Sequence, residues 1–135
     1  MPIAREAAII NLVSYVIEMF EGLRLTSYKD PGGVWTIGFG RTQAVEPGQT
    51  CSRDEAVEWL TNSISVMMPL VNSYSVATAA GYLDFGYNCG MGALQRVLSG
   101  KAVLSGFVHD KAGNILPGLV RRRAFEQAMI EAGNV

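Results

Sequence analysis

The sequence predicts a single α+β domain, residues 1–135, with a small antiparallel hairpin lobe at about residues 22–50 and a helical remainder. Three observations support this prediction: an apolar helical pattern at the start, two short strand-like segments around a proline–glycine turn, and helical segments after residue 52. A length of 135 residues fits one domain. With 49% hydrophobic and 17% charged residues, the chain is of the kind that folds around a buried core.

The first predicted element is a helix from Ile3 to Glu21, in which apolar residues recur at helical spacing. Its polar residues form a narrow stripe that ends at Glu21, and Gly22 is a typical helix stop. We predict no transmembrane helix, because the apolar part is too short and contains polar side chains. Arg5 and Glu6 do not fit a signal peptide. A membrane-anchor role in export is the alternative.

Two strands are predicted next, Leu25–Lys29 and Val34–Arg41, joined by Asp30-Pro31-Gly32-Gly33. Proline followed by glycine favours a type II turn with aspartate in the leading position. Folding about this turn brings Asp30 close to Thr36 across the hairpin.

Alternation along the second strand places Thr36 on the same face as Gly38 and Gly40. Glycines at these positions leave room for a ligand to approach. A purely structural role is the alternative, in which Asp30 only caps the turn and Thr36 only favours a strand.

The remaining chain is predicted to be helical. Ser52-Arg53-Asp54-Glu55 is a capping box that opens a helix ending before Pro69, with Trp59 in the core. Pro117 fits the first turn of the last helix. The other predicted helices are a central buried one at Val76–Cys89, short ones at Ala93–Leu98 and Ala102–Val108, and the last one to about Ile130.

Charge and residue usage exclude several functions. The net charge of -1 and the pI of 5.8 give no basic stripe, so we predict no nucleic-acid partner. His109 is the only histidine and is predicted to lie in a loop, which argues against a His-rich metal site or a Ser-His-Asp triad. Cys51 and Cys89 are predicted to be free thiols, with a disulfide as the alternative.

Three arginines, Arg121-Arg122-Arg123, occupy almost a full turn of the last helix and cannot all face one ligand. We predict a solvated basic face with one arginine in a buried ion pair, and a substrate clamp is the alternative.

The strongest functional signal is the placement of two carboxylates around one hairpin. Glu21 lies at the end of the first helix, Asp30 precedes the turn, and the Thr36 hydroxyl follows on the returning strand. Hydrolysis of a glycosidic bond uses two such carboxylates, one to protonate the leaving oxygen and one to stabilise charge or activate water.

This run, Glu21 to Gly40, resembles the phage-type lysozymes (endolysins), which carry their catalytic residues at the same Glu-x8-Asp-x5-Thr spacing. The flanking Glu-Gly-Leu-Arg-Leu and Trp-Thr-Ile-Gly-Phe-Gly segments agree as well, and Leu116 to Arg123 resembles a C-terminal motif of the family.

The resemblance implies a lysozyme-like fold with a cleft between the two lobes, and hydrolysis of the β-1,4 bond between N-acetylmuramic acid and N-acetylglucosamine in peptidoglycan. It assigns Glu21 as general acid, Asp30 as an ionised carboxylate and Thr36 as a water-holding hydroxyl, with no metal and no cofactor. It further implies a monomer without stable membrane insertion, made in the host cytoplasm, exported with a holin or similar protein, and acting on the wall in the periplasm.

A second short motif, Tyr87-Asn88-Cys89-Gly90, resembles the family's Phe-Asn-x-Gly helix end, which makes Asn88 a candidate substrate contact. The alternative is an ordinary helix C-terminal residue.

The chain departs from the family in two places. Arg41 stands where relatives carry histidine, and the region from Gly90 to Asn114 is shorter. We predict that Arg41 pairs with Asp30 or Glu21. These departures leave an alternative function: a catalytically weak wall-binding or virion-structural relative with the same fold.

Overall fold

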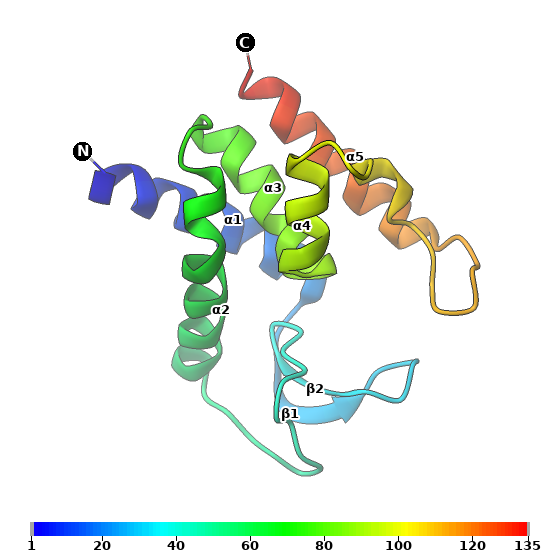
Figure 1. Cartoon of the computed structure of the whole chain (residues 1–135). Coiled ribbons are helices and arrows are strands. Elements are labelled where there is room, and N and C mark those ends of the chain that lie inside the picture. Colours follow the sequence, from blue (N-terminus) through cyan, green and yellow to red (C-terminus); the bar gives the residue numbers. More distant parts are fainter. Residues whose placement is uncertain (1, 135) are drawn as a thin grey trace.

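The structure is a computed structural model that describes residues 2–134. Over this range the chain forms an antiparallel hairpin and a larger group of helices, so the predicted α+β class is confirmed (Figure 1). The elements are α1 (Pro2–Glu21), β1 (Arg24–Lys29), β2 (Trp35–Gly38), α2 (Arg53–Met67), η1 (Met68–Val71), α3 (Val76–Cys89), α4 (Met91–Leu98), η2 (Leu104–Gly106) and α5 (Pro117–Ala132).

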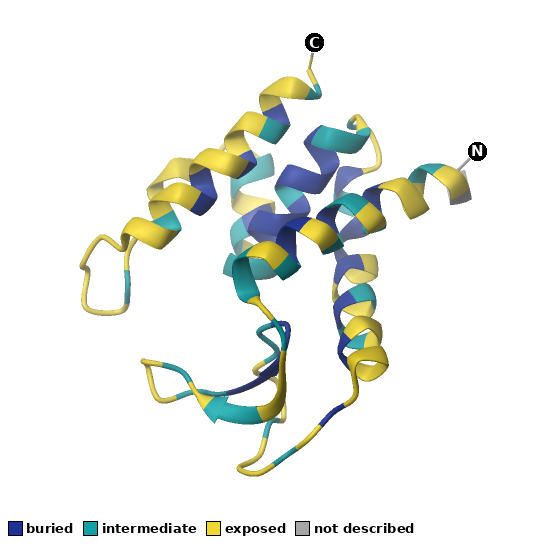
Figure 2. Cartoon of the chain, turned by 180° about the vertical axis from the view of Figure 1, so that it is seen from behind, coloured by how far each residue is buried: buried dark blue, intermediate teal, exposed yellow. Residues whose placement is uncertain are grey.

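Helix α3 lies at the centre of the helical part and packs against α1, α4 and α5. Its apolar face, with Ala79, Leu83 and Phe85, has no exposed surface. Figure 2 shows the buried residues concentrated on α3 and on the sides of α1 and α5 that face it. The core therefore holds the end of α1 and the start of α5 against one helix, and that arrangement positions the candidate site.

The hairpin forms where it was predicted, but its turn and its second strand differ. Gly33 donates its N–H to the Asp30 carbonyl at 2.9 Å, and the positive φ of 82° is at Gly33. A type II turn needs the positive φ at Gly32, so that prediction was wrong. A type I turn followed by a left-handed glycine matches the twist of a three-residue hairpin loop.

Strand β2 is also shorter than predicted, because the chain folds back after Gly38. Gly38 and Gly40 adopt positive φ values of 68° and 83°, and Ile37 and Arg41 then exchange two backbone hydrogen bonds of 2.9 Å. A tight turn at 38–40 thus replaces the predicted end of the strand and places Gly40 against Glu21, the last residue of α1.

The helix predictions agree closely with the structure. The capping box opens α2, with the Ser52 hydroxyl accepting from the Glu55 N–H at 3.0 Å and the Glu55 carboxylate accepting from the Ser52 N–H at 2.9 Å. The central helix has the predicted bounds, and α5 begins at Pro117. Ala102–Val108 was predicted as a helix but holds only the short η2 turn.

After η2 the chain extends as an arm, residues 107–116, in which His109 pairs with Ile115 around a turn that begins at Asp110. The arm projects from the helical part on the side of the hairpin turn (Figure 1). Cys51 and Cys89 are free thiols, as predicted. Of the helices described, none is long and apolar enough to cross a membrane.

Candidate active site

Glu21 is the last residue of α1 and lies where the helical part meets the hairpin lobe. Gly22 ends the helix as predicted, with a φ of 69° and its N–H bonded to the Glu18 carbonyl at 2.9 Å. The Glu21 side chain keeps 22% of its surface exposed, so solvent reaches it from one side. On the other side, its Oε2 accepts a hydrogen bond of 2.5 Å from Nη1 of Arg122.

Arg122 is itself fixed by a second carboxylate. Its Nε and Nη2 donate to the two oxygens of Asp84 on α3, both at 2.9 Å, and the Asp84 side chain is completely buried. Burial alone would lower the pKa of Arg122, but the hydrogen bonds and charges of Asp84 and Glu21 outweigh burial and raise the pKa. The guanidinium is therefore a permanent, rigidly oriented cation beside Glu21.

A third carboxylate completes this buried cluster. Glu126 has no exposed surface and lies 2.8 Å from Arg123 and 3.9 Å from Arg122. Burial, and then hydrogen bonding with the charged Asp84, raise the pKa of Glu126 to about 10. With three carboxyl groups and two guanidinium groups, the cluster is neutral when it retains one proton, and the raised pKa of Glu126 favours that neutral form.

The cluster corrects the prediction for the three arginines. Arg121 is exposed, as expected, but both Arg122 and Arg123 are buried in ion pairs, at 5% and 2% exposure. The reason is that α5 packs lengthwise on α3, which presents Asp84 and leaves space for two guanidinium groups.

Gly40 forms the contact between the hairpin lobe and Glu21. A Cβ atom built on Gly40 would lie 2.5 Å from Oε1 of Glu21 and 3.0 Å from its Cδ, far inside van der Waals contact. The absence of a side chain at this position therefore allows the Glu21 carboxylate to lie against the lobe.

Asp30 and Thr36 are held by the same residue of the hairpin. Oδ1 of Asp30 accepts the Val34 N–H at 2.8 Å, and the Thr36 hydroxyl donates to the Val34 carbonyl at 3.0 Å. Asp30 is half-buried, and Thr36 is only 4% exposed. The carboxylate and the hydroxyl are thus oriented by short local bonds, and the Thr36 oxygen keeps its lone pairs for another donor.

Gly38 does not leave the space that the sequence suggested. A Cβ there would meet Ala56 at 3.3 Å and the Trp59 ring at 3.4 Å. Helix α2 packs on this glycine, while Gly40 accommodates Glu21. Gly38 therefore serves close packing within the chain, and the prediction that it makes room for a ligand was wrong.

Asn88 lies near the end of α3 and is half-buried. Its Oδ1 accepts a hydrogen bond of 2.6 Å from Nη2 of Arg123, which fixes the amide. Arg123 also donates to the Cys89 sulfur at 2.6 Å. Asn88 is therefore linked to Glu21 only indirectly, through the buried cluster.

Arg41 does not pair with Asp30 or Glu21, so that prediction was wrong. Among the described residues no carboxylate lies within ion-pair distance of Arg41, whose guanidinium carbon lies 4.7 Å from the centre of the Trp59 ring. The turn at 38–40 directs Arg41 toward α2 and away from the buried cluster, and Arg122 occupies the place beside Glu21.

Trp59 was predicted to be a core residue and is only partly buried, because its ring is shared between the core and Arg41. Tyr87 lies nearby and donates its hydroxyl proton to the Phe39 carbonyl. Burial and the neighbouring charge of Glu21 raise the pKa of Tyr87, so it remains a neutral donor.

The sequence analysis missed Asp84 and Glu126, and it did not connect Gly40 or Arg122 with Glu21. One signal was available for Asp84, which is the only charged residue of the otherwise apolar Val76–Cys89 helix. Within residues 2–134 no group of three or more His, Cys, Asp or Glu side chains is arranged to hold a metal ion, and no residue is assigned to a cofactor.

Comparison with known proteins identifies the family of the chain. The phage lysozyme family model matches residues 18–126. An endolysin of Bacillus phage PZA is 30% identical over 87% of the chain, which spans only 53% of that relative. An endolysin of Acyrthosiphon pisum secondary endosymbiont phage 1 is 26% identical over 87% of the chain and 93% of the relative.

Solved structures give the same fold. The active form of the P1 phage endolysin Lyz is 22% identical, with a TM-score of 0.75 over 96% of this chain and 95% of that one. The muramidase domain of SpmX from Asticaccaulis excentricus is 24% identical, with a TM-score of 0.70 over 92% and 94%. The predicted lysozyme-like fold is thus confirmed. The chain belongs to the phage lysozyme family of glycoside hydrolases.

Proposed function

We propose that this protein is a muramidase that hydrolyses the β-1,4 bond between N-acetylmuramic acid and N-acetylglucosamine in peptidoglycan. The observation that supports this most is the position of Glu21, a partly exposed carboxyl group held between Arg122 and Gly40 at the junction of the two lobes. A carboxyl group with one solvent-facing side can deliver a proton to a bound substrate.

In the first step Glu21 donates its proton to the glycosidic oxygen, and the bond from that oxygen to the anomeric carbon breaks. The Arg122 guanidinium lies beside the carboxyl group that gives the proton, and it shares its charge with the buried Asp84 carboxylate. After proton transfer the same guanidinium stabilises the Glu21 carboxylate, which favours the forward direction of the step.

Asp30 and Thr36 act on the opposite side of the bond. The ionised Asp30 stabilises positive charge on the sugar ring and accepts a proton from the attacking water. Thr36, whose hydroxyl proton is used by the Val34 carbonyl, accepts a hydrogen bond from that water. Attack from the face opposite Glu21 gives inversion at the anomeric carbon.

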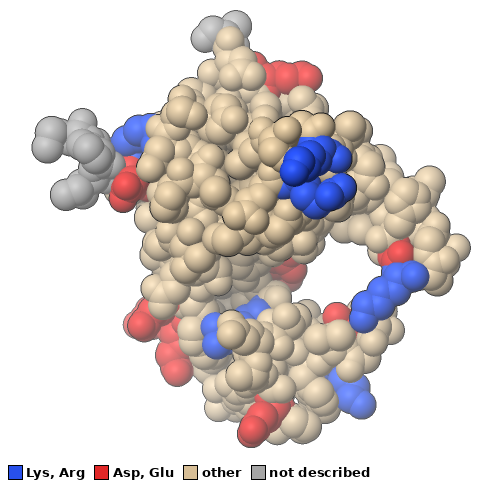
Figure 3. Space-filling model, in the orientation of Figure 1, with Lys and Arg blue, Asp and Glu red and all other residues tan. Residues whose placement is uncertain are grey.

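The other partners follow from the same proposal. The substrate is a glycan strand, and the Asn88 amide, whose oxygen is used by Arg123, offers its N–H groups to a sugar acetamido group. The enzyme acts as a monomer, is made in the host cytoplasm, and reaches the periplasmic wall through a holin or similar protein. Figure 3 shows acidic and basic side chains scattered over one face of the molecule. We therefore propose no nucleic-acid partner, because nucleic acids bind to continuous basic surfaces.

The test is the clearing of outer-membrane-permeabilised Gram-negative cells, measured by turbidity. Glu21→Gln should lower the rate by about 10²–10⁴-fold, because the amide cannot donate the proton. Glu18→Gln, one turn earlier and in a surface ion pair with Arg53, is the matched control and should keep the rate.

Proton NMR of the first-formed product should show the α anomer. A β anomer would overturn the water-attack mechanism. A folded wild-type protein that binds walls without clearing cells would instead support the wall-binding alternative.

A further inference from the structure

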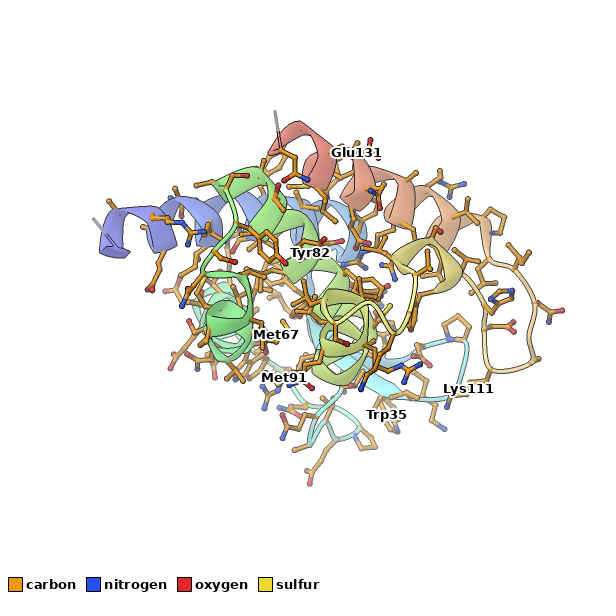
Figure 4. All side chains as sticks on the ribbon, turned by 45° about the horizontal axis from the view of Figure 1, so that its top comes forward. Trp35, Met67, Tyr82, Met91, Lys111 and Glu131 are labelled. Atoms are coloured by element: carbon orange, nitrogen blue, oxygen red, sulfur yellow. The ribbon has the colours of Figure 1, made fainter. Side chains whose placement is uncertain are left out.

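A cavity of about 400 Å³ lies beside Gly40, between the hairpin lobe, α2 and the junction of α3 and α4. This volume is within the range of small-molecule sites, roughly 300–1,000 Å³. Met67 and Met91 reach it from α2 and α4, and Figure 4 shows these two side chains near each other. The cavity is contiguous with the candidate active site, because Gly40 borders both.

The charged group in this cavity is Arg41. Among the residues that the structure describes, it has no ion-pair partner, and its guanidinium lies over Trp59 at 4.7 Å. Stacking on an aromatic ring holds a guanidinium flat and leaves its edge N–H groups for a planar anion. Arg122, by contrast, donates from all three of its nitrogens to Asp84 and Glu21.

The rest of the wall combines apolar and neutral polar groups. Met67, Val66 and Met91 supply an apolar surface, whereas Thr42 and Gln43 supply hydrogen-bonding groups. An apolar, partly enclosed wall strengthens the attraction between a guanidinium and an anion. Such a site fits a short peptide with a free carboxylate, because the amides can use the polar groups and the carboxylate can bind Arg41.

We propose that this cavity is an accessory subsite in which Arg41 binds a free carboxylate of the peptide stem carried by the muramic acid residue of the substrate. The inference rests on the proposed function, since peptidoglycan is the polymer that presents such peptides beside the cleaved bond. An extended peptide spans about 3.3–3.6 Å per residue, so a stem of a few residues reaches from the sugar beside Glu21 past Gly40.

The first test measures binding without hydrolysis. A free stem peptide is titrated into the protein while the indole N–H signal of Trp59 is followed by NMR. The signal should shift saturably, Arg41→Gln should weaken binding at least fivefold, and Arg96→Gln, an exposed arginine on α4, should not. A peptide with amidated carboxylates should bind the wild type as weakly as the free peptide binds Arg41→Gln.

Equal binding of the free and amidated peptides, or no shift at millimolar peptide, would overturn the proposal.

The second test compares kcat/KM on soluble glycan strands with intact stems and on the same strands stripped of peptide. Arg41→Gln should lower the ratio of the two values at least fivefold, mainly through KM, and an unchanged ratio would also overturn the proposal. If the wild type hydrolysed neither substrate, the proposed function would be contradicted. The binding test would still show whether Arg41 binds the peptide carboxylate in this cavity.

Discussion

In the hairpin lobe, Asp30 and Thr36 form hydrogen bonds with Val34, which lies within four residues of each in the sequence. In the helical part, by contrast, Glu21 is held by Arg122, which lies 101 positions away. The first arrangement uses hydrogen bonds to the backbone of a nearby residue. The second uses ion pairs among side chains that, apart from Glu21 itself, have almost no exposed surface. Local bonds orient the groups of the lobe, and a buried charge cluster orients the acid.

The two regions therefore respond differently to substitution. Removing one member of a buried charge network leaves another charge unpaired, which costs stability throughout the domain. Changing a partly exposed carboxylate in a turn leaves the fold intact and alters only what that carboxylate does. Substitutions in the buried cluster and in the hairpin should therefore differ in their effects on stability and on activity.

The largest expected effect is on stability and comes from the cluster. Asp84→Ala removes the bidentate partner of Arg122 and should lower the free energy of unfolding by about 3–5 kcal/mol. Arg53→Ala, which breaks the exposed Arg53–Glu18 pair, should change it by about 0–1 kcal/mol. Urea unfolding measures both, and similar losses for the two variants would contradict the special role of the buried pair.

The second prediction concerns the pH dependence of stability. The pKa of Glu126 is raised from 4.5 to about 10, so the folded state keeps a proton that the unfolded state releases. This contribution is present below pH 4.5 and is lost as the pH rises toward 10. Between about pH 6 and 8 the wild type should therefore lose stability relative to Glu126→Gln, by at most about 1.4 kcal/mol per pH unit.

Urea midpoints at three pH values check this prediction, with Glu131→Gln, an exposed position on α5, as the control. Parallel curves for the wild type and Glu126→Gln would mean that Glu126 is ionised in the folded protein and that the cluster carries a net negative charge.

The third prediction tests the hairpin. Asp30→Asn keeps an oxygen that accepts the Val34 N–H, so the turn should keep its structure. The rate of wall hydrolysis should fall roughly 10²-fold, because the amide carries no negative charge. Asp110→Asn changes a similar aspartate turn in the arm, where Oδ1 accepts from Ala112 and Asn114, and should keep activity. Unfolding of Asp30→Asn would show that the lobe depends on the charge itself.

The smallest expected effect is at the contact between the regions. Gly40→Ala introduces a methyl group 2.5 Å from the Glu21 carboxylate and should displace it, with a loss of about tenfold in rate. Gly48→Ala is the matched control, because it has a similar positive φ of 73° but open space around it. An equal loss of rate in both variants would show that the contact with Glu21 is irrelevant.

Much of the fold was predictable from local sequence. The Ser52 capping box, Pro117 at the start of α5 and the apolar run from Val76 to Cys89 each specify backbone structure through neighbours a few residues away. The same holds for the spacing of Glu21, Asp30 and Thr36, which indicated the family that the comparisons then established.

Three of the errors share one cause. Arg41, Gly38 and the Arg121–Arg123 run were interpreted from their neighbours in sequence, but each has a decisive partner on another element: Trp59, Ala56 with Trp59, and Asp84. The order of residues determined the helices, the hairpin and the candidate acid. Only the packing of α5 on α3 and of α2 on the hairpin decided that Arg122 lies beside Glu21 and that Arg41 has no ion-pair partner among the described residues. The reason is that charge pairing depends on distances that tertiary structure alone fixes.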